Sequence, residues 1–178
     1  MAVIGWGKPR VLAKDLDTPG SQWFELPTPV ENSTQLTTQK GDKKEAKLEG
    51  GENEDVRYSK NTYALALNIR AAKSRKRPIS DSDGLVAHKY AIVVQPEDKD
   101  VQGIAIEKAT VSVEDTFSTE EGGIWAYLFD ALKPDSGKNQ VSWGKIIITE
   151  SDGTISKVEC DPEDDAGETD KFEVAAAE

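Results

Sequence analysis

The sequence has little of what disulfide-stabilised, membrane-spanning or metal-dependent proteins require. It contains one cysteine, Cys160, which excludes an intrachain disulfide framework. No apolar run approaches the length of a membrane span, and the first ten residues lack the charged and apolar regions of a signal peptide. These absences predict a soluble protein that is made and kept in a reducing cytoplasm.

Basic residues are also in deficit, and the deficit is uneven along the chain. Lys and Arg number 22 against 33 Asp and Glu, which gives a net charge of -11. Residues 151–178 hold ten acidic residues and two lysines, so residues 1–150 carry a net charge of only -3. A dedicated nucleic-acid binder needs Lys and Arg to neutralise phosphates, and this balance argues against that class.

What the chain does have is frequent glycine and proline, which divide it into short segments. With 178 residues and a hydrophobic share of 37%, it suits one domain with a core. Short strands between such breakers predict an all-β sandwich or barrel. In the clearest strand the apolar side chains from Tyr63 to Ile69 alternate with small or polar ones. The expected strands are residues 22–26, 32–40, 45–48, 56–59, 62–71, 89–95, 104–115, 124–132, 141–149 and 154–159.

Two strand features can be predicted in more detail. Ile104 and Ile106 share one parity while Val111 and Val113 share the other, so a β-bulge is expected near residues 108–110. A turn-rich linker joins residues 124–132 to 141–149, and the two are expected to form a long hairpin. Residues 124–132 also contain helix formers, but their aromatic and β-branched content favours a strand.

One short helix is expected at residues 81–88. Pro78 precedes this segment, and Ser80, Asp81 and Ser82 offer N-cap oxygens. Asp81, Asp83 and Gly84 also resemble part of a calcium loop, but the further ligands at the required spacing are missing. A helix cap with a turn explains these residues better.

Candidate catalytic groups are few. His88 is the only histidine and has no evident partner set, so a surface or structural role is expected. Cys160 lies between Glu159 and Asp161, whose charges raise a thiol pKa and disfavour a nucleophile. Residues 159–170 could attract cations loosely, without a fixed geometry. We therefore expect no enzyme activity and no catalytic, cofactor-binding or metal-binding residues.

A basic cluster is the best candidate for a nucleic-acid contact. It consists of Arg70, Lys73, Arg75, Lys76 and Arg77. The cluster has no interleaved aromatic residues for base stacking, so a solvated or intersubunit salt-bridging loop is the preferred interpretation. Gly50 and Gly51 do not form a phosphate loop, because carboxylates flank them, and they are expected to allow a tight turn.

Four tryptophans supply large apolar surfaces. Trp125 and Trp143 lie on the two predicted hairpin strands and are expected in the core. Trp6 and Trp23 lie in the N-terminal segment, where burial against another subunit and an intramolecular role are both open.

Several segments together resemble phage tail tube proteins, in particular the major tail proteins of siphophage-like prophages. The resemblance covers roughly residues 1–150 and rests on overall sequence character, with no single diagnostic motif. The segments that carry it are the N-terminal stretch through Trp23-Phe24-Glu25-Leu26-Pro27, residues 40–55 around Leu48-Glu49-Gly50-Gly51-Glu52, residues 63–70, Gln95-Pro96-Glu97-Asp98, residues 111–117, and Phe129-Asp130-Ala131-Leu132-Lys133-Pro134.

The resemblance implies a β-sandwich or partial barrel with a short helix, six copies of which form a ring around a β-barrel lumen. Stacked rings would form a structural tube that conducts DNA without binding it specifically. The implied partners are copies of the same chain and the tape-measure, tail terminator and baseplate or tip proteins. No cofactor and no membrane insertion are implied. The protein would be assembled in the bacterial cytoplasm and located in the virion tail.

The resemblance also assigns roles to segments. Residues 1–20 would be an N-terminal arm, and residues 21–150 the tail-tube domain with an inter-ring loop at 40–55. Residues 62–71 and 104–115 would be lumen or sheet strands. The acidic segment 151–178 would be an outer-surface extension, or would pack on the sheet through Ile155, Val158, Phe172 and Val174. The expected contacts between subunits or rings are Lys43, Lys44, Glu45, Lys47, Glu49, Glu52, Asp55, Trp6 and Trp23.

Two other functions remain open at this point. The chain could be a different tail or injection-system component, such as a tail terminator, a head-tail adaptor or a contractile injection tube. It could also be a β-sandwich that binds a small ligand or carbohydrate on exposed tryptophans. A monomeric binder has no need of a long loop with charges of both signs, so residues 40–55 favour the tube.

Overall fold

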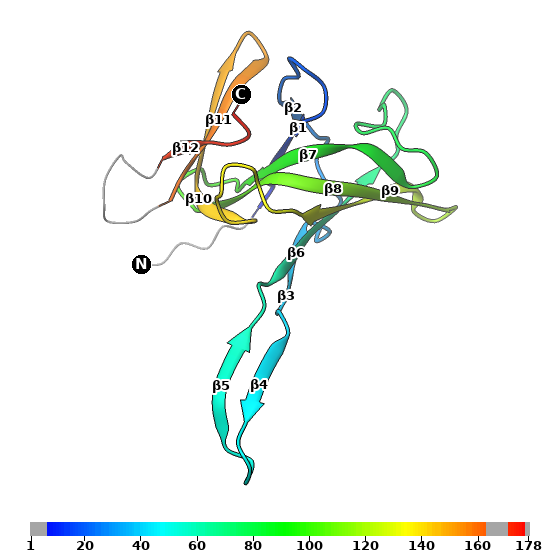
Figure 1. The fold of residues 1–178 in the computed structure, drawn as a ribbon. Helices are drawn as coiled ribbons and strands as arrows, with labels where there is room; N and C mark the ends of the chain where they lie inside the picture. Colours follow the sequence, from blue (N-terminus) through cyan, green and yellow to red (C-terminus); the bar gives the residue numbers. More distant parts are fainter. Residues whose placement is uncertain (1–6, 163–170, 177–178) are drawn as a thin grey trace.

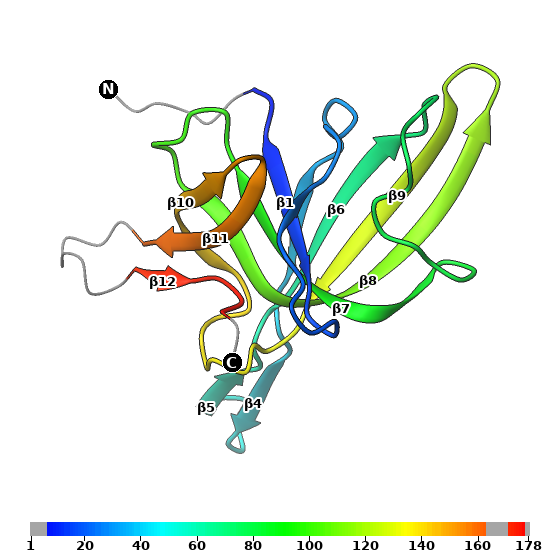
Figure 2. The same cartoon turned by 90° about the horizontal axis from the view of Figure 1, so that it is seen from above.

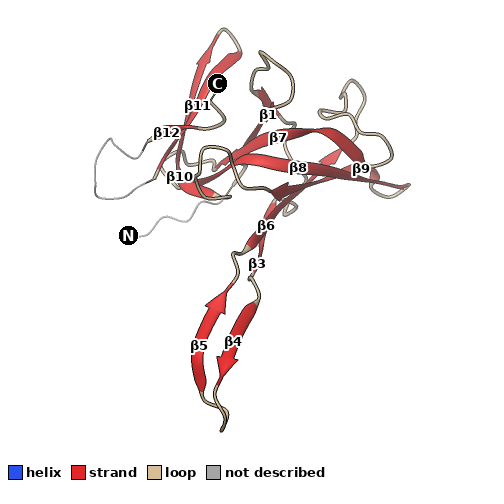
Figure 3. Ribbon diagram, in the orientation of Figure 1, coloured by secondary structure: helices blue, strands red, loops and turns tan. Residues whose placement is uncertain are grey.

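The protein is all-β. The computed structural model describes residues 7–162 and 171–176, and within them there is no helix, hence none that could cross a membrane (Figure 3). The strands are β1 (Arg10–Asp15), β2 (Phe24–Glu25), β3 (Gln35–Gln39), β4 (Lys43–Lys47), β5 (Asn53–Tyr58), β6 (Thr62–Arg70), β7 (Leu85–Gln95), β8 (Gly103–Ser118), β9 (Gly122–Ala131), β10 (Ser142–Ser151), β11 (Thr154–Asp161) and β12 (Phe172–Glu173).

Ten of these strands form one antiparallel sheet organised around β8, the longest strand. The order is β12-β11-β10-β8-β7-β1-β2, and β9 joins β8 to β6, which pairs with β3. The start of β8 pairs with β10 and the rest with β9, while β7 lies along its other edge. Seen from above, β10 and β11 diverge from β6 and β9 on either side of β1 (Figure 2).

This arrangement encloses two apolar cores, one on each face of β1 and β7. Side chains alternate across a strand, so Val11 and Ala13 enter the first core while Leu12 enters the second. In the first core they meet β6 and β9, including Leu67 and Phe129. The second core is completed by β10, β11 and the segment after them. β1 and the second half of β7, from Ala91 to Gln95, thus form a layer that is buried on both faces.

The predicted bulge in β8 is confirmed, slightly earlier than expected. Ile92 pairs with Ile106 and Tyr90 with Ala109, so β8 has one more residue than β7 between these pairs. The extra residue changes the phase of the strand. Ile106 and Val111 can therefore both enter the first core despite their opposite parity.

Each of the ten predicted strands overlaps an observed strand, but β1 and β12 were not predicted. β1 corrects the predicted N-terminal arm at residues 1–20, because residues 10–15 lie inside the sheet between β7 and β2. The alternation expected from Tyr63 to Ile69 is confirmed, since Leu65, Leu67 and Ile69 are all buried.

The helix predicted at residues 81–88 is wrong. Asp81 uses its carboxylate to accept the N–H of Gly84 at 2.9 Å, which closes a turn. Asp83 and Gly84 have φ values of 50° and 83°, outside the right-handed helical region, and β7 begins at Leu85. The Asp81 carboxylate, one of the three side chains predicted to cap a helix, therefore stabilises a turn, a structure that Asp also favours.

The predicted hairpin of residues 124–132 and 141–149 is also wrong, although both segments are strands. β9 and β10 pair with different parts of β8. The linker between them runs along β8, where Leu132 donates its N–H to the Lys108 carbonyl at 2.8 Å. The Ser136 hydroxyl donates to the Glu107 carboxylate at 2.5 Å. These bonds direct the chain to the other core.

The C-terminal segment packs on the sheet, which was one of the two predicted alternatives; the other was an extension on the outer surface. Ile155 and Val158 on β11 and Val174 after β12 are buried in the second core, and Phe172 packs against it. The predicted boundary at residue 150 falls within β10, so β11 continues the sheet. The most acidic stretch, residues 163–170, lies outside the described residues.

Candidate functional site

The strands β4 and β5 form a separate two-stranded sheet that projects from the body (Figure 1). At its tip, Leu48 donates its N–H to the Glu52 carbonyl at 2.8 Å, and Gly51 donates to the Leu48 carbonyl at 3.1 Å. Gly50 and Gly51 have φ values of 99° and 88°, which only glycine adopts at little cost. The predicted tight turn is therefore present, and the predicted loop at residues 40–55 is a hairpin that continues to Tyr58.

The root of the hairpin depends on another glycine. Gly41 donates its N–H to the Asn61 side chain at 3.2 Å, and Ser59 donates to the Asp42 carbonyl at 2.9 Å. A Cβ atom at Gly41 would lie 2.0 Å from the Ser59 carbonyl oxygen. Only glycine permits this close crossing of the two chain segments, which fixes where the hairpin leaves the body.

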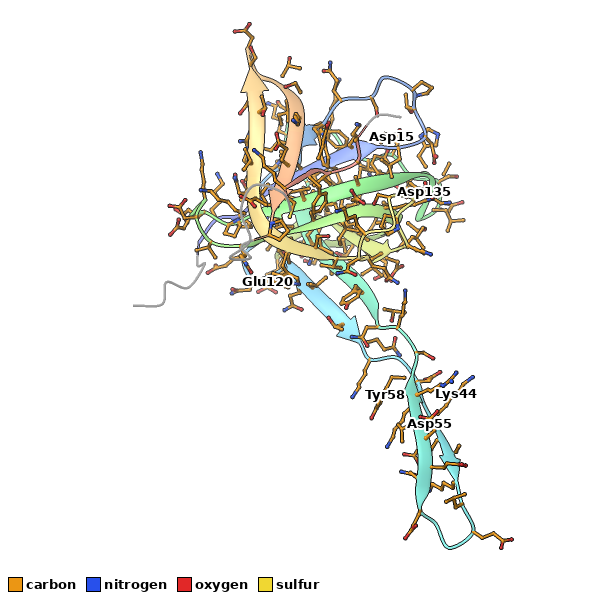
Figure 4. The ribbon with its side chains drawn as sticks, turned by 60° about the vertical axis from the view of Figure 1, so that its left-hand side comes forward. Asp15, Lys44, Asp55, Tyr58, Glu120 and Asp135 are labelled. Atoms are coloured by element: carbon orange, nitrogen blue, oxygen red, sulfur yellow. The ribbon has the colours of Figure 1, made fainter. Side chains whose placement is uncertain are left out.

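The hairpin has two faces of different chemistry. Residues directly opposite in an antiparallel pair point the same way, so Tyr58 and Val56 share a face with Lys43 and Glu45. Lys44 lies on the opposite face, and Figure 4 shows it directed away from Tyr58. The Tyr58 side chain is half exposed, and the Lys40 ammonium lies 4.8 Å from its ring centroid.

Charged side chains on the hairpin pair with one another. Glu45 contacts Lys43 and also Lys47, the latter at 3.6 Å, and Arg57 contacts Asp55 at 3.5 Å. The hydrogen bond between Lys43 and Glu45 raises the pKa of the lysine and lowers the pKa of the glutamate. Such solvated pairs stabilise a fold only slightly. Because an isolated two-stranded hairpin is itself marginal in water, a packing partner would add much of its stability.

The structure places the charged residues predicted as contacts on this one hairpin, where they are exposed. They are Lys43, Lys44, Glu45, Lys47, Glu49, Glu52 and Asp55. The predicted segment ends at Asp55 and therefore does not include Arg57 and Tyr58, which belong to β5. The alternation of Val56 and Tyr58 with polar neighbours was the available signal.

The two tryptophans predicted as contacts differ from this group. Trp23 is 6% exposed, bridges to Ile155 and belongs to the second core, so the structure favours its intramolecular alternative. Trp6 lies outside the described residues. Trp125 packs against the first core as expected, whereas Trp143 is 53% exposed and the prediction of a core position is wrong.

His88 and Cys160 occupy structural positions. The His88 Nδ1 atom lies 2.8 Å from the Asp15 carboxylate, at the surface where β7 approaches the end of β1. The hydrogen bond from the His88 ring to the Asp15 carboxylate raises the pKa of His88. Cys160 is fully buried in the second core, and burial raises the pKa of its thiol to about 11. A thiol in this environment is a poor nucleophile.

The basic cluster lies at the end of β6 and in the loop between β6 and β7, and its arginines hold this loop in place. Arg77 contacts Asp81 and also Asp115, the latter at 2.9 Å. Arg75 donates to the Arg70 carbonyl at 2.6 Å. The Asp81 carboxylate accepts hydrogen bonds from Arg77 and from the N–H of Gly84. Both bonds hold the turn, so the role of Asp81 is structural. Within residues 7–162 and 171–176, no three His, Cys, Asp or Glu side chains are arranged to hold a metal ion.

An open surface cavity of about 740 Å³ lies between the β1–β2 loop, residues 134–136 and the end of the described chain. Figure 4 shows Asp15 and Asp135 on this part of the body. Many of the lining side chains are charged, and several of them are already engaged by neighbouring groups. Lys14 donates to the Ala175 carbonyl at 2.9 Å, and Lys108 contacts Asp135 at 3.4 Å. Among the described residues that line the cavity there is no aromatic side chain on which a sugar could stack.

The hairpin is therefore the exposed feature that the fold of the body leaves unexplained. No protein-family model matches the chain, and no curated protein is significantly similar to it.

Proposed function

We propose that this protein is the protomer of a phage tail tube, a structural protein that polymerises into stacked rings and conducts DNA. The observation that carries the proposal is the β4–β5 hairpin, which extends from a well-packed body with its side chains in solvent. Ordered, two-stranded and rich in both charges, it has the form of a connector between identical copies. The sequence resemblance supports the same function.

A second observation concerns the sheet β3-β6-β9-β8. The face turned away from the first core carries mostly small or polar side chains, which we call the outer sheet face. Its members are Gln35, Thr37, Gln39, Thr62, Ala64, Ala66, Asn68, Arg70, Thr110, Ser112, Glu114, Thr116, Ile124, Ala126, Leu128 and Asp130. It carries the carboxylates Glu114 and Asp130, and its arginine, Arg70, lies at the end of β6 and donates to the Glu121 carbonyl. A polyanion would be held only weakly by such a surface, because few cations are available to bind its phosphates.

The strand β3 supports lateral assembly. It pairs with β6 on one side only, so its other edge presents unpaired backbone groups within the described residues. Sheets that join edge to edge around a ring remove such edges, as a closed barrel does. In this arrangement β3 would be the lateral contact and the hairpin the axial one.

The ligand-binding alternative is less well supported. The strongly exposed aromatic side chains are Tyr58 on the hairpin, Phe117 near the end of β8, and Trp143, which pairs with Ile104 near the start of β8. Phe117 and Ile104 are 13 positions apart on the strand, roughly 40 Å at the usual rise per residue. These side chains therefore form no common platform for a sugar.

The decisive experiment compares the wild-type chain with a variant in which residues 43–58 are replaced by a short turn. Negative-stain microscopy and sedimentation should show rings and tubes for the wild type at high concentration. The variant should remain a folded subunit that does not elongate. A wild-type chain that stays monomeric at millimolar concentration would overturn the proposal. If the variant forms normal tubes, the hairpin is not the contact that joins the rings.

A further inference from the structure

Two surfaces of opposite charge lie at opposite ends of β6. The acidic tip of the hairpin consists of Glu49, Glu52, Glu54 and Asp55, and these residues are exposed. The basic loop consists of Lys73, Arg75 and Lys76, which follow the other end of β6 and are also exposed. β6 begins at the hairpin root and ends at Arg70, so the fold places these two surfaces far apart.

The basic loop is held in a defined position. Ile79 is 1% exposed in the first core, and its carbonyl accepts the Tyr127 hydroxyl at 3.1 Å. Arg77 is fixed by Asp81 and Asp115. Lys73 and Lys76 have no carboxylate partner among the described residues. A fixed loop loses little conformational entropy when a partner binds, so it is preorganised for binding.

Most carboxylates of the acidic tip are also free to bind a partner. Asp55 contacts Arg57, but Glu49, Glu52 and Glu54 have no cationic partner within the described part of the chain. Lys47, the nearest lysine on β4, already contacts Glu45. The cationic side chains of the segment gather instead near the root, at Lys40, Lys43, Lys44, Arg57 and Lys60. The hairpin thus has a basic root and an acidic tip.

The tip and the basic loop of one chain cannot meet. β6 has nine residues, and about nine more separate its start from the tip, so at the rise of a strand the distance is on the order of 50 Å. Figure 1 shows the loop after β6 on the side of the body away from the hairpin. A contact between these surfaces must join two molecules.

We propose that the acidic tip of one copy binds the basic loop of the next copy. This inference rests on the proposed tube and specifies its axial contact. Two different surfaces of the same chain meet, so the contact is heterologous and can repeat without limit along an axis. Charge complementarity of this kind steers the encounter and fixes the register of the partners.

Nucleic acid is the competing partner for the basic loop. The loop has no aromatic side chain for base stacking. Arg70 donates to the Glu121 carbonyl, which brings the turn with Glu120 and Glu121 beside the loop. These carboxylates repel an extended polyanion that covers the turn as well as the loop, such as a duplex, whereas a compact acidic surface can contact the loop alone. The hairpin tip is an acidic surface of this limited size.

The test uses two charge-reversed variants of the full chain. The tip variant carries Glu49→Lys and Glu52→Lys, and the loop variant carries Lys73→Glu and Lys76→Glu. Each variant alone should elongate only at a concentration about tenfold or more above that of the wild type, because like charges meet at the contact. A 1:1 mixture should elongate like the wild type, since every contact in alternating copies is again between opposite charges. Sedimentation and microscopy measure both outcomes.

Matched controls reverse the same number of charges elsewhere. They are Glu31→Lys with Asp152→Lys, and Lys99→Glu with Lys133→Glu, all exposed positions. Both controls should elongate like the wild type. Single variants that elongate normally, or a mixture that fails to recover, would overturn the tip–loop contact while wild-type tubes preserve the proposed function. If labelled duplex DNA binds the wild type and not the loop variant, and mixing restores no elongation, the loop binds nucleic acid instead.

Discussion

The guanidinium of Arg77 lies over the indole of Trp125, with 5.2 Å between Cζ and the ring centroid. The same group contacts the carboxylates of Asp81 and Asp115. One side chain therefore joins the loop between β6 and β7 to the strands β8 and β9. Hydrogen bonds to these carboxylates outweigh the opposing effect of burial, and the pKa of Arg77 is raised.

Replacing Arg77 should destabilise the protein. Arg77→Ala removes two charge-assisted contacts and leaves the Asp81 side chain, which is 6% exposed, without its cation. We expect the free energy of unfolding to fall by about 2 kcal/mol, measured by urea denaturation. Arg77→Lys should lower the free energy of unfolding by less, because the lysine keeps the positive charge, although it lacks the planar guanidinium that contacts both carboxylates. Lys76→Ala is the control and should change the stability by less than about 0.5 kcal/mol. Equal stabilities of Arg77→Ala and the control would contradict the role of Arg77.

The His88–Asp15 pair predicts a pH dependence of stability. The pKa of His88 is raised above 6.5 by its hydrogen bond to Asp15. A raised folded-state pKa stabilises the protein fully below pH 6.5, and the contribution is lost as the pH rises through the folded-state pKa. His88→Gln should therefore be less stable than the wild type below pH 6.5, and the difference should vanish in alkaline solution. Urea denaturation across this range measures it. A difference that grows with pH would contradict the assignment.

Trp23 and Trp143 should respond differently to truncation. Trp23 is buried in the second core beside Ile155, so Trp23→Ala should lower the free energy of unfolding by about 3–5 kcal/mol. Trp143 is half exposed on β10, and Trp143→Ala should cost about 1 kcal/mol or less in the isolated subunit. Denaturation of both variants under the same conditions makes the comparison. A larger cost at Trp143 would contradict the exposure in the structure.

The sequence predicted the fold class because strands with one solvent-exposed face alternate visibly. β6 is the clearest example, since Leu65, Leu67 and Ile69 are buried while their neighbours are less so. β1 was missed because both of its faces are buried, so Val11, Leu12 and Ala13 are consecutive apolar residues without alternation. The turn at Asp81 was mistaken for a helix start because Asp and Ser oxygens serve both structures equally.

The candidate site was predictable in part for a similar reason. The run of interleaved charges around Gly50 and Gly51 marks an exposed segment that cannot form a core. Its pairing into a hairpin with Tyr58 and Arg57 depends on register, which alternation in so polar a segment specifies weakly. The relation between the acidic tip and the basic loop could not be predicted. It depends on their positions at the two ends of β6, and therefore on the pairing of the whole sheet.

The close crossing at Gly41 predicts that a single methyl group would alter the hairpin and spare the body. In Gly41→Ala the new Cβ atom would meet the backbone carbonyl of Ser59, which cannot rotate away like a side chain. The hairpin root must then shift, so we expect faster cleavage by trypsin at Lys43, Lys44 and Lys47 and weaker elongation. The free energy of unfolding of the body should change by less than about 1 kcal/mol, because neither core is touched. Gly50→Ala is the matched control, since its Cβ meets nothing within 4 Å and only the tip is strained. If Gly41→Ala is cleaved and elongates like the wild type, the direction of the hairpin does not depend on this crossing.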